Sequence, residues 1–205
     1  MSTANHKLIY SDGYGRGEPL RLIFVYAGAK FEDFRTTPEI WEKIKEEQPF
    51  KQVPVLEVNG VKLAQSAAIT SYLGNTFGLN GKTPFENAQV LQFILGVDDV
   101  LLSFKEVYVI KDEAEKAIKV KEFVDTHVAA FFKNYDHFYA KNGGLHLVGK
   151  SVTVADIVLF HWFWTFSNKF GANLAPYKEI KKAYDAIANN PKIKAYLESR
   201  PVRDL

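Results

Sequence analysis

The chain has 205 residues, of which 47% are apolar and 24% are charged, so it can bury a substantial core and keep a polar surface. Its formal net charge of +2 is too small to indicate binding to nucleic acid or to an anionic membrane. There is no cysteine, which excludes disulfides, cysteine metal sites and cysteine nucleophiles.

The apolar residues are spread along the chain in short runs. No run reaches the roughly eighteen residues that a membrane-spanning helix needs. The first residues, MSTANHKLIYSDG, are polar and do not resemble the apolar core of a secretory signal. These features favour a soluble cytoplasmic protein.

Up to about residue 80, short strand-like runs alternate with helical ones, which is typical of an α/β layer. Thr37 followed by Pro38 supplies a helix cap and a proline at the first helical position. Asn59-Gly60 suits a type I′ turn, so the strands on either side of it should pair antiparallel. We expect strands at HKLIY, FEDFRTT, PVLEV and VKL, and helices at EPLRLIFVYAGA, after Thr37 and at SAAITSYLGNTFG.

Beyond residue 83 only helical patterns follow. Thr83-Pro84-Phe85-Glu86 is a capping box with proline at the first helical position, and Thr153 to Asp156 should cap a later, largely buried helix. Helices are expected from Pro84 onward, over about 113–141, at IVLFHWFWTF, and near 177–189 and 191–199. The chain therefore predicts an α/β domain over residues 1–79, a linker at 80–83 and an all-α domain over 84–205.

Two glycine-rich stretches resemble nucleotide-binding motifs. Residues 144–151, GLHLVGKS, match the P-loop letters, but the segment before them has a helical period and no strand feeds the loop. Gly13, Gly15 and Gly17 lie between a strand and a helix, yet Glu18 occupies the last glycine position of the dinucleotide pattern. We therefore reject nucleotide binding. The histidines are too scattered for a metal site, so no metal is expected.

The stretch QVPVLEVNGVKLAQS carries more than a hairpin needs. Pro54 at the head of its first strand ends the strand ladder and leaves the backbone of Val53 for an outside peptide. Gln65 and Ser66 open a helix, whose N–H donors and serine hydroxyl suit a carboxylate. The two ends together describe a small-peptide site. The alternative is a plain hairpin with a proline at its edge and a serine cap.

The motifs KLIYSDGYGRGEPLR, WEKIK, the stretch just described, KTPFE and SVTVADI follow one another in an order and spacing that resemble a cytosolic glutathione transferase. The chain is most similar to the sigma class, in its nematode-like branch, and the resemblance covers the whole chain. It implies a thioredoxin-like first domain with a mixed four-stranded sheet, an all-helical second domain that holds the electrophile pocket, a homodimer, and glutathione as the co-substrate.

The resemblance also implies the site residues. Tyr10 takes the place of the catalytic tyrosine, whose hydroxyl donates to the sulfur of glutathione. Val53 clamps the cysteinyl backbone, and Asp99 of the partner subunit pairs with the γ-glutamyl ammonium, with Asp98 as the alternative. Trp41 and Lys45 contact the glycyl end of glutathione. Gln65 and Ser66 bind the γ-glutamyl carboxylate. The implied glutathione-binding set is Tyr10, Arg16, Trp41, Lys45, Gln52, Val53, Pro54, Gln65, Ser66 and Asp99, and Pro54 is expected to be cis.

A single hydrogen bond is enough for most of the expected thiol activation. A free thiol has a pKa of about 8.5, and lowering it by about two units requires roughly 2.7 kcal/mol of thiolate stabilisation. One hydrogen bond to a charged group contributes about 1.5–3 kcal/mol. Tyr10 can therefore supply most of the shift, and Arg16 or local backbone dipoles the rest, with no general base.

The chain departs from the family pattern at several positions. Ser11 stands where the family commonly has Phe, and Tyr14 where it has Arg, so the first loop is more polar and the role of Tyr14 is open. Gln52 and Glu106 replace a lysine and a tryptophan of the vertebrate prostaglandin D synthases, which puts prostaglandin isomerisation in doubt. We expect a transferase that attacks small apolar electrophiles in detoxification. The alternatives are a non-catalytic binder of haem or other apolar ligands, and a crystallin-like structural protein on the same fold.

Overall fold

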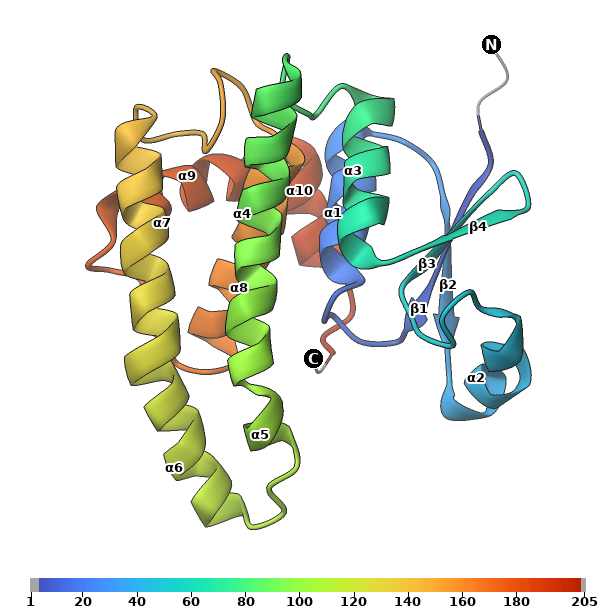
Figure 1. The fold of residues 1–205 in the computed structure, drawn as a ribbon, viewed down its shortest axis with the longest axis horizontal. Coiled ribbons are helices and arrows are strands. Elements are labelled where there is room, and N and C mark those ends of the chain that lie inside the picture. The colour runs from blue at the N-terminus through green and yellow to red at the C-terminus, as the bar shows by residue number, and fades with distance from the viewer. Residues whose placement is uncertain (1–3, 204–205) are drawn as a thin grey trace. The chain divides into compact units, whose positions relative to one another are not determined.

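The structure is a computed structural model that describes residues 4–203, without the side chain of Tyr108. The chain divides into two units (Figure 1). The first comprises Met1–Leu79 together with Asn189–Leu205, and the second comprises Asn80–Ala188.

The first unit is built on a mixed four-stranded sheet in the order β2-β1-β3-β4. The edge strand β2 pairs parallel with β1, whereas β3 pairs antiparallel with both β1 and β4. Asn59 and Gly60 have φ values of 50° and 86°, as a type I′ turn requires, so the predicted hairpin is confirmed. The strands are β1 (His6–Ser11), β2 (Glu32–Thr36), β3 (Val55–Val58) and β4 (Val61–Ala64).

Helices cover both faces of this sheet. Figure 1 shows α1 and α3 side by side on one face and α2 on the other. Thr37 caps α2 by accepting a hydrogen bond from the Ile40 N–H at 3.3 Å, as its sequence predicts. The helices of this unit are α1 (Glu18–Ala27), α2 (Pro38–Ile44) with the 3₁₀ turn η1 (Lys45–Glu47), α3 (Ser66–Phe77) and α10 (Pro191–Ser199). Their apolar faces and the sheet enclose a core of Leu8, Leu20, Ile23, Phe24, Leu56, Ile69 and Leu73.

The last helix, α10, packs on α1 and so belongs to the first unit. The sequence analysis grouped residues 84–205 in one helical domain, whereas the described residues from Asn189 onward group with the first unit in the structure. Ile193 is fully buried, and the Arg200 guanidinium pairs with Glu18 at 2.6 Å. A helical period identifies the face that is buried but not the core that receives it, which is why the sequence placed α10 with its chain neighbours.

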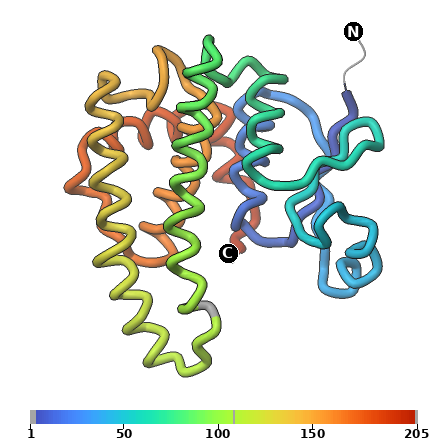
Figure 2. The backbone as a smooth tube through the Cα atoms, viewed as in Figure 1, coloured from blue at the N-terminus to red at the C-terminus, as the bar shows by residue number. Residues whose placement is uncertain are grey.

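The second unit is entirely helical within its described residues, in agreement with the sequence. The predicted capping box is present, because Thr83 accepts from the Glu86 N–H at 3.1 Å and Glu86 accepts from the Thr83 N–H at 3.2 Å. Figure 2 shows α6, η2 and α7 as one continuous rod beside α4. The elements are α4 (Pro84–Ser103), α5 (Lys105–Tyr108), α6 (Glu113–Phe123), the π-helical turn η2 (Val124–Val128), α7 (Ala129–Lys141), α8 (Val154–Asn168) and α9 (Lys178–Ala188).

Helix α8 forms the centre of this unit and contacts both α4 and α9. The connection that leads to it, residues 142–153, contains the P-loop-like letters and lies between two helices, as the sequence analysis concluded. The Asn142 amide donates to the carbonyls of His146 at 2.8 Å and Gly149 at 2.9 Å, which holds the connection in place. Within residues 4–203, no helix is both long and apolar enough to cross a membrane.

Candidate active site

Three of the predicted site residues meet at one end of the sheet. The strand register pairs Ile9 with Val55, and Val55 with Ala64. Tyr10, Pro54 and Gln65 each lie one residue beyond this row of pairs, so β1, β3 and β4 bring them to the same end of the sheet. The Val53–Pro54 peptide bond is cis, as the resemblance implied.

The Tyr10 hydroxyl is held by the loop that follows its own strand. The backbone N–H of Arg16 donates to this hydroxyl at 3.0 Å. A phenol that accepts an N–H keeps its own proton for another acceptor, so Tyr10 remains a hydrogen-bond donor. The side chain is half-buried. Arg16 therefore reaches the phenol through its backbone N–H, where the sequence had left open whether Arg16 or local backbone dipoles assist Tyr10.

The loop encloses the Tyr10 ring closely. A Cβ built on Gly17 would lie 2.3 Å from Cδ1 of Tyr10, and one on Gly15 would lie 2.4 Å from its hydroxyl oxygen. Carbon atoms in contact are normally about 3.5–4 Å apart. These two glycines therefore provide the room that the tyrosine ring occupies. Gly15 also has a φ of +35°, which favours glycine.

The buried guanidinium of Arg21 also holds the loop between β1 and α1. The Arg21 side chain is fully buried and donates to the carbonyls of Gly13 at 2.8 Å and Ser11 at 3.2 Å. Its Nε donates to Asp33 at 2.9 Å, so the guanidinium is neutralised while it holds the loop backbone. The Arg21 guanidinium carbon also lies 5.7 Å from the centre of the Tyr10 ring.

The start of α3 presents backbone donors. Gln65 precedes the helix with φ 72° and ψ 114°, a conformation that residues other than glycine rarely adopt, and its side chain is exposed. Ser66 is the first helical residue, and among the described residues no side chain caps this helix. Unsatisfied N–H groups and the helix dipole make such an end attractive to an anion. Backbone strain of this kind gathers at binding sites.

Three further predicted residues lie in the first unit between β2 and β3. Trp41 in α2 and Lys45 in η1 are four residues apart, so they share one face, and the Lys45 N–H donates to the Trp41 carbonyl. Both side chains are half-buried, whereas Gln52 is exposed in the segment before Val53.

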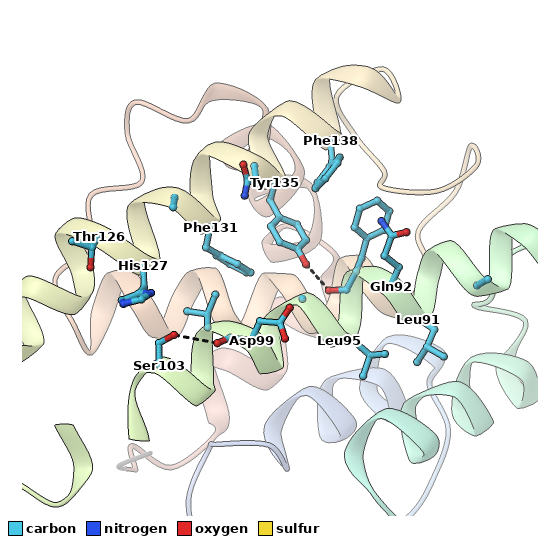
Figure 3. Close-up of a pocket in the computed structure, with 16 residues that line it drawn as sticks. Leu91, Gln92, Leu95, Asp99, Ser103, Thr126, His127, Phe131, Tyr135 and Phe138 are labelled. Carbon is cyan, nitrogen blue, oxygen red and sulfur yellow. Dashed lines mark hydrogen bonds between the residues drawn. The ribbon is translucent and has the colours of Figure 1, made fainter. Parts of the chain in front are cut away.

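Asp99 lies in the helical unit, on the wall of an open groove of about 1020 Å³ between α4 and the η2–α7 rod. Figure 3 shows Asp99 and Leu95 projecting from α4, with His127 and Tyr135 on the opposite wall. Tyr135 donates to the Phe93 carbonyl at 2.6 Å. Burial, and secondly the Asp99 charge, raise the pKa of the Tyr135 hydroxyl. Asp99 is exposed at this groove.

Both halves of the chain match models of one family. Residues 7–75 match the glutathione S-transferase N-terminal domain, and residues 98–200 match the glutathione S-transferase C-terminal domain. Over 199 residues the chain is 39% identical to glutathione S-transferase 1 of Ascaris suum, covering 96% of this chain and 97% of that protein. The chain belongs to the glutathione S-transferase family.

Two further relatives extend this comparison. The solved structure of NaGST-2 matches with a TM-score of 0.89 and 37% identity, covering 99% of this chain and 100% of that one. Hematopoietic prostaglandin D synthase of Gallus gallus is 36% identical over 200 residues, covering 96% of this chain and 97% of that protein. The expected enzyme class and the thioredoxin-like fold followed by a helical domain are confirmed. Glutathione S-transferases use glutathione as their co-substrate.

For a glutathione S-transferase, the loop after β1 holds features that the sequence analysis did not find. Gly15 and Gly17 were compared only with a nucleotide fingerprint, yet they pack on the Tyr10 ring. A glycine pair five and seven residues after a strand-end tyrosine was the available signal. The contacts of Tyr14 with residues near 200 had no signal in the sequence, because they join positions 187 and 189 residues apart.

Proposed function

We propose that this protein is a cytoplasmic glutathione S-transferase of the sigma class, which activates the thiol of glutathione for attack on small apolar electrophiles in detoxification. The observation that carries the proposal is the Tyr10 hydroxyl, which accepts the Arg16 N–H at 3.0 Å at the same sheet end as Pro54 and Gln65. Its own proton is thereby left for the sulfur of glutathione.

In this proposal glutathione lies across the first unit. The γ-glutamyl carboxylate binds at the start of α3, where Gln65 and Ser66 combine exposed backbone donors with a hydroxyl. The backbone of Val53, next to Pro54, pairs with the cysteinyl residue in the manner of an added strand. The glycyl carboxylate reaches the shared face of Trp41 and Lys45, beside the exposed Gln52.

The chemistry asked of Tyr10 is within the reach of one hydrogen bond. A bound thiolate at neutral pH needs roughly 2.7 kcal/mol relative to a free thiol with a pKa of about 8.5. A phenol that donates to the anionic sulfur supplies about 1.5–3 kcal/mol. Because the Arg16 N–H donates to the same phenol oxygen, it withdraws electron density from the O–H and strengthens that donation.

We further propose that the enzyme acts as a homodimer through the α4 face of the groove. Leu91 and Leu95 are 38% and 43% exposed, and together with Asp99 they recur every four residues on one side of α4. A second copy that covers the leucines would also contact Asp99. Asp99 of the partner subunit is then available to the γ-glutamyl ammonium, and Asp98, which is half-buried, is the alternative.

The electrophile is expected to be small and apolar, and the helical unit is expected to supply its pocket. Prostaglandin D isomerisation is disfavoured because Glu106, which by the family resemblance stands where the vertebrate prostaglandin D synthases have a tryptophan, is an exposed carboxylate on α5. An exposed charge offers no apolar surface to a lipid-derived substrate.

The experiment is a conjugation assay with glutathione and an aryl halide, followed by detection of the thioether product. The proposal predicts product formation by the wild-type protein and a turnover about ten- to one-hundredfold lower in Tyr10→Phe. Tyr72→Phe is the matched control, because that hydroxyl contacts His6 at 3.2 Å rather than the site. No conjugation by a folded wild-type protein that binds glutathione would favour the non-catalytic ligand binder.

A further inference from the structure

Tyr14 lies in the loop between β1 and α1 and is buried, with 3% of its surface exposed. Its hydroxyl donates to the Pro201 carbonyl at 3.0 Å and accepts from the Arg203 N–H at 3.2 Å. This one hydroxyl therefore binds both a backbone carbonyl and a backbone N–H of the segment 200–203. We call residues 200–203 the strap.

The strap holds the loop at two more points. Nε of Arg203 donates to the Asp12 carboxylate at 2.8 Å, and the Arg200 guanidinium donates to Glu18 at 2.6 Å. The guanidinium carbon of Arg200 also lies 4.5 Å from the centre of the Tyr14 ring, a cation–π contact. The strap thus contacts the beginning, the middle and the end of the loop that runs from Ser11 to Glu18.

The middle of this loop is the part that touches Tyr10. Gly15 and Arg16 follow Tyr14 directly, and the Arg16 N–H reaches the Tyr10 hydroxyl at 3.0 Å. The Glu18 N–H donates to the Tyr14 carbonyl at 2.8 Å, which closes a turn around Gly15, Arg16 and Gly17. A displacement of Tyr14 is therefore transmitted to the N–H group on which the orientation of the Tyr10 hydroxyl depends.

We propose that Tyr14 and the strap are positioning residues for Tyr10: they hold the Arg16 N–H within hydrogen-bonding distance of the phenol. The proposal rests on the function proposed above, in which this phenol donates to the thiolate. It assigns a role to the tyrosine that stands where the resemblance expects an arginine. Tyr14 acts through the loop and not on the sulfur, since its own hydroxyl already has partners in Pro201 and Arg203.

The test compares Tyr14→Phe with the wild-type dimer. The substitution removes one oxygen and keeps the buried ring. Tyr177→Phe is the matched control, because the Tyr177 hydroxyl also donates to a backbone carbonyl, that of Ala129 at 3.3 Å, in the helical unit. Three quantities are measured: amide hydrogen exchange in residues 11–17, the pH midpoint of thiolate formation by bound glutathione, and the dissociation constant for glutathione.

We expect Tyr14→Phe to speed exchange in residues 11–17 about tenfold, since one hydrogen bond that holds the loop is lost. The thiolate midpoint should rise by about half a pH unit or more, with turnover reduced and glutathione affinity within about twofold of wild type. Tyr177→Phe should change none of these quantities. Arg203→Gln, which breaks an exposed pair with Asp12, should act in the same direction with a smaller size and serves if Tyr14→Phe does not fold.

Unchanged exchange in residues 11–17 and an unchanged thiolate midpoint would overturn the proposal, even if the melting temperature fell. A wild-type protein that forms no thiolate would instead refute the function assigned to Tyr10. In that case the exchange measurement alone decides whether the strap holds the loop, so the two failures are distinguishable.

Discussion

Asp156 at the start of α8 provides the sharpest stability prediction. Its carboxylate is fully buried and accepts hydrogen bonds from the Leu147 N–H at 2.9 Å, the Thr153 N–H at 2.8 Å and the Thr153 hydroxyl at 3.0 Å. It therefore joins the connection from α7 to the first turn of the central helix. Asp156→Ala would remove the acceptor for these donors at once.

The size of the loss follows from these contacts. Each buried N–H left without a partner costs about 1–3 kcal/mol, and two backbone N–H groups are affected. Burial raises the pKa of Asp156 even though the N–H groups of Thr153 and Leu147 act in the opposite direction. Part of the free energy gained from these hydrogen bonds therefore offsets the cost of removing the carboxylate from water. We expect Asp156→Ala to lower the free energy of unfolding by about 3–5 kcal/mol, which lies within the roughly 2–6 kcal/mol that two unpaired buried N–H groups cost.

The raised pKa also sets the sign of a pH dependence. Between the ordinary pKa of an aspartate and the higher value in the folded state, the folded protein binds more protons at Asp156 than the unfolded chain does. The stability that Asp156 contributes therefore falls as the pH rises through this window. The loss caused by Asp156→Ala should be larger at about pH 4 than at about pH 7.

The assay is urea unfolding followed by tryptophan fluorescence, because two of the three tryptophans, Trp162 and Trp164, lie in α8. Asp112→Ala is the control, because Asp112 caps α6 at an exposed position through one bond to the Glu115 N–H at 2.8 Å, where about 1 kcal/mol is expected. Equal losses for the two variants, or a loss from Asp156→Ala that grows with pH, would refute this reasoning.

Three further predictions concern the site and the assembly. Gly17→Ala would place a methyl group 2.3 Å from Cδ1 of Tyr10, so the tyrosine ring must move. Steady-state kinetics should show turnover reduced about tenfold or more, and titration should show little change in glutathione affinity. In calorimetry, Ser66→Ala should weaken glutathione binding by about 1–2 kcal/mol, and Asp99→Ala should weaken it by at least as much. An Asp99→Ala dimer that binds glutathione as tightly as wild type would contradict the cross-subunit contact. Leu95→Glu should convert the dimer to a monomer in sedimentation, and a wild-type protein that is monomeric at micromolar concentration removes the partner's Asp99 from the site.

The parts of the fold that the sequence predicted well depend on neighbouring residues. The Thr37 and Thr83 caps and the Asn59-Gly60 turn are decided by interactions over four residues or fewer, and all are present. The strand pairs around that turn follow from it. The placement of α10 was not predictable in this way, because it depends on contacts such as Arg200 with Glu18, which are 182 residues apart.

The site residues also differ in whether the neighbouring sequence was enough to identify them. Pro54, Gln65 and Ser66 could be singled out because each has a local peculiarity: a proline that interrupts the ladder, or a polar pair that opens a helix. The role of Tyr10 came from the resemblance, since a tyrosine at a strand end has no pattern of its own. The surroundings of Tyr10, with the Arg16 N–H and the contacts of Tyr14, require the loop to be folded and could not be read from spacing.

The most direct test of the central claim is the pH titration of glutathione bound to the wild-type protein and to Tyr10→Phe, followed by the ultraviolet absorbance of the thiolate. We predict a midpoint about two units below the value of about 8.5 for a free thiol in the wild type, and a rise most of the way back in Tyr10→Phe at nearly unchanged affinity. The same midpoint in both proteins, or loss of the thiolate in Tyr14→Phe but not in Tyr10→Phe, would contradict the assignment of Tyr10 as the thiol activator.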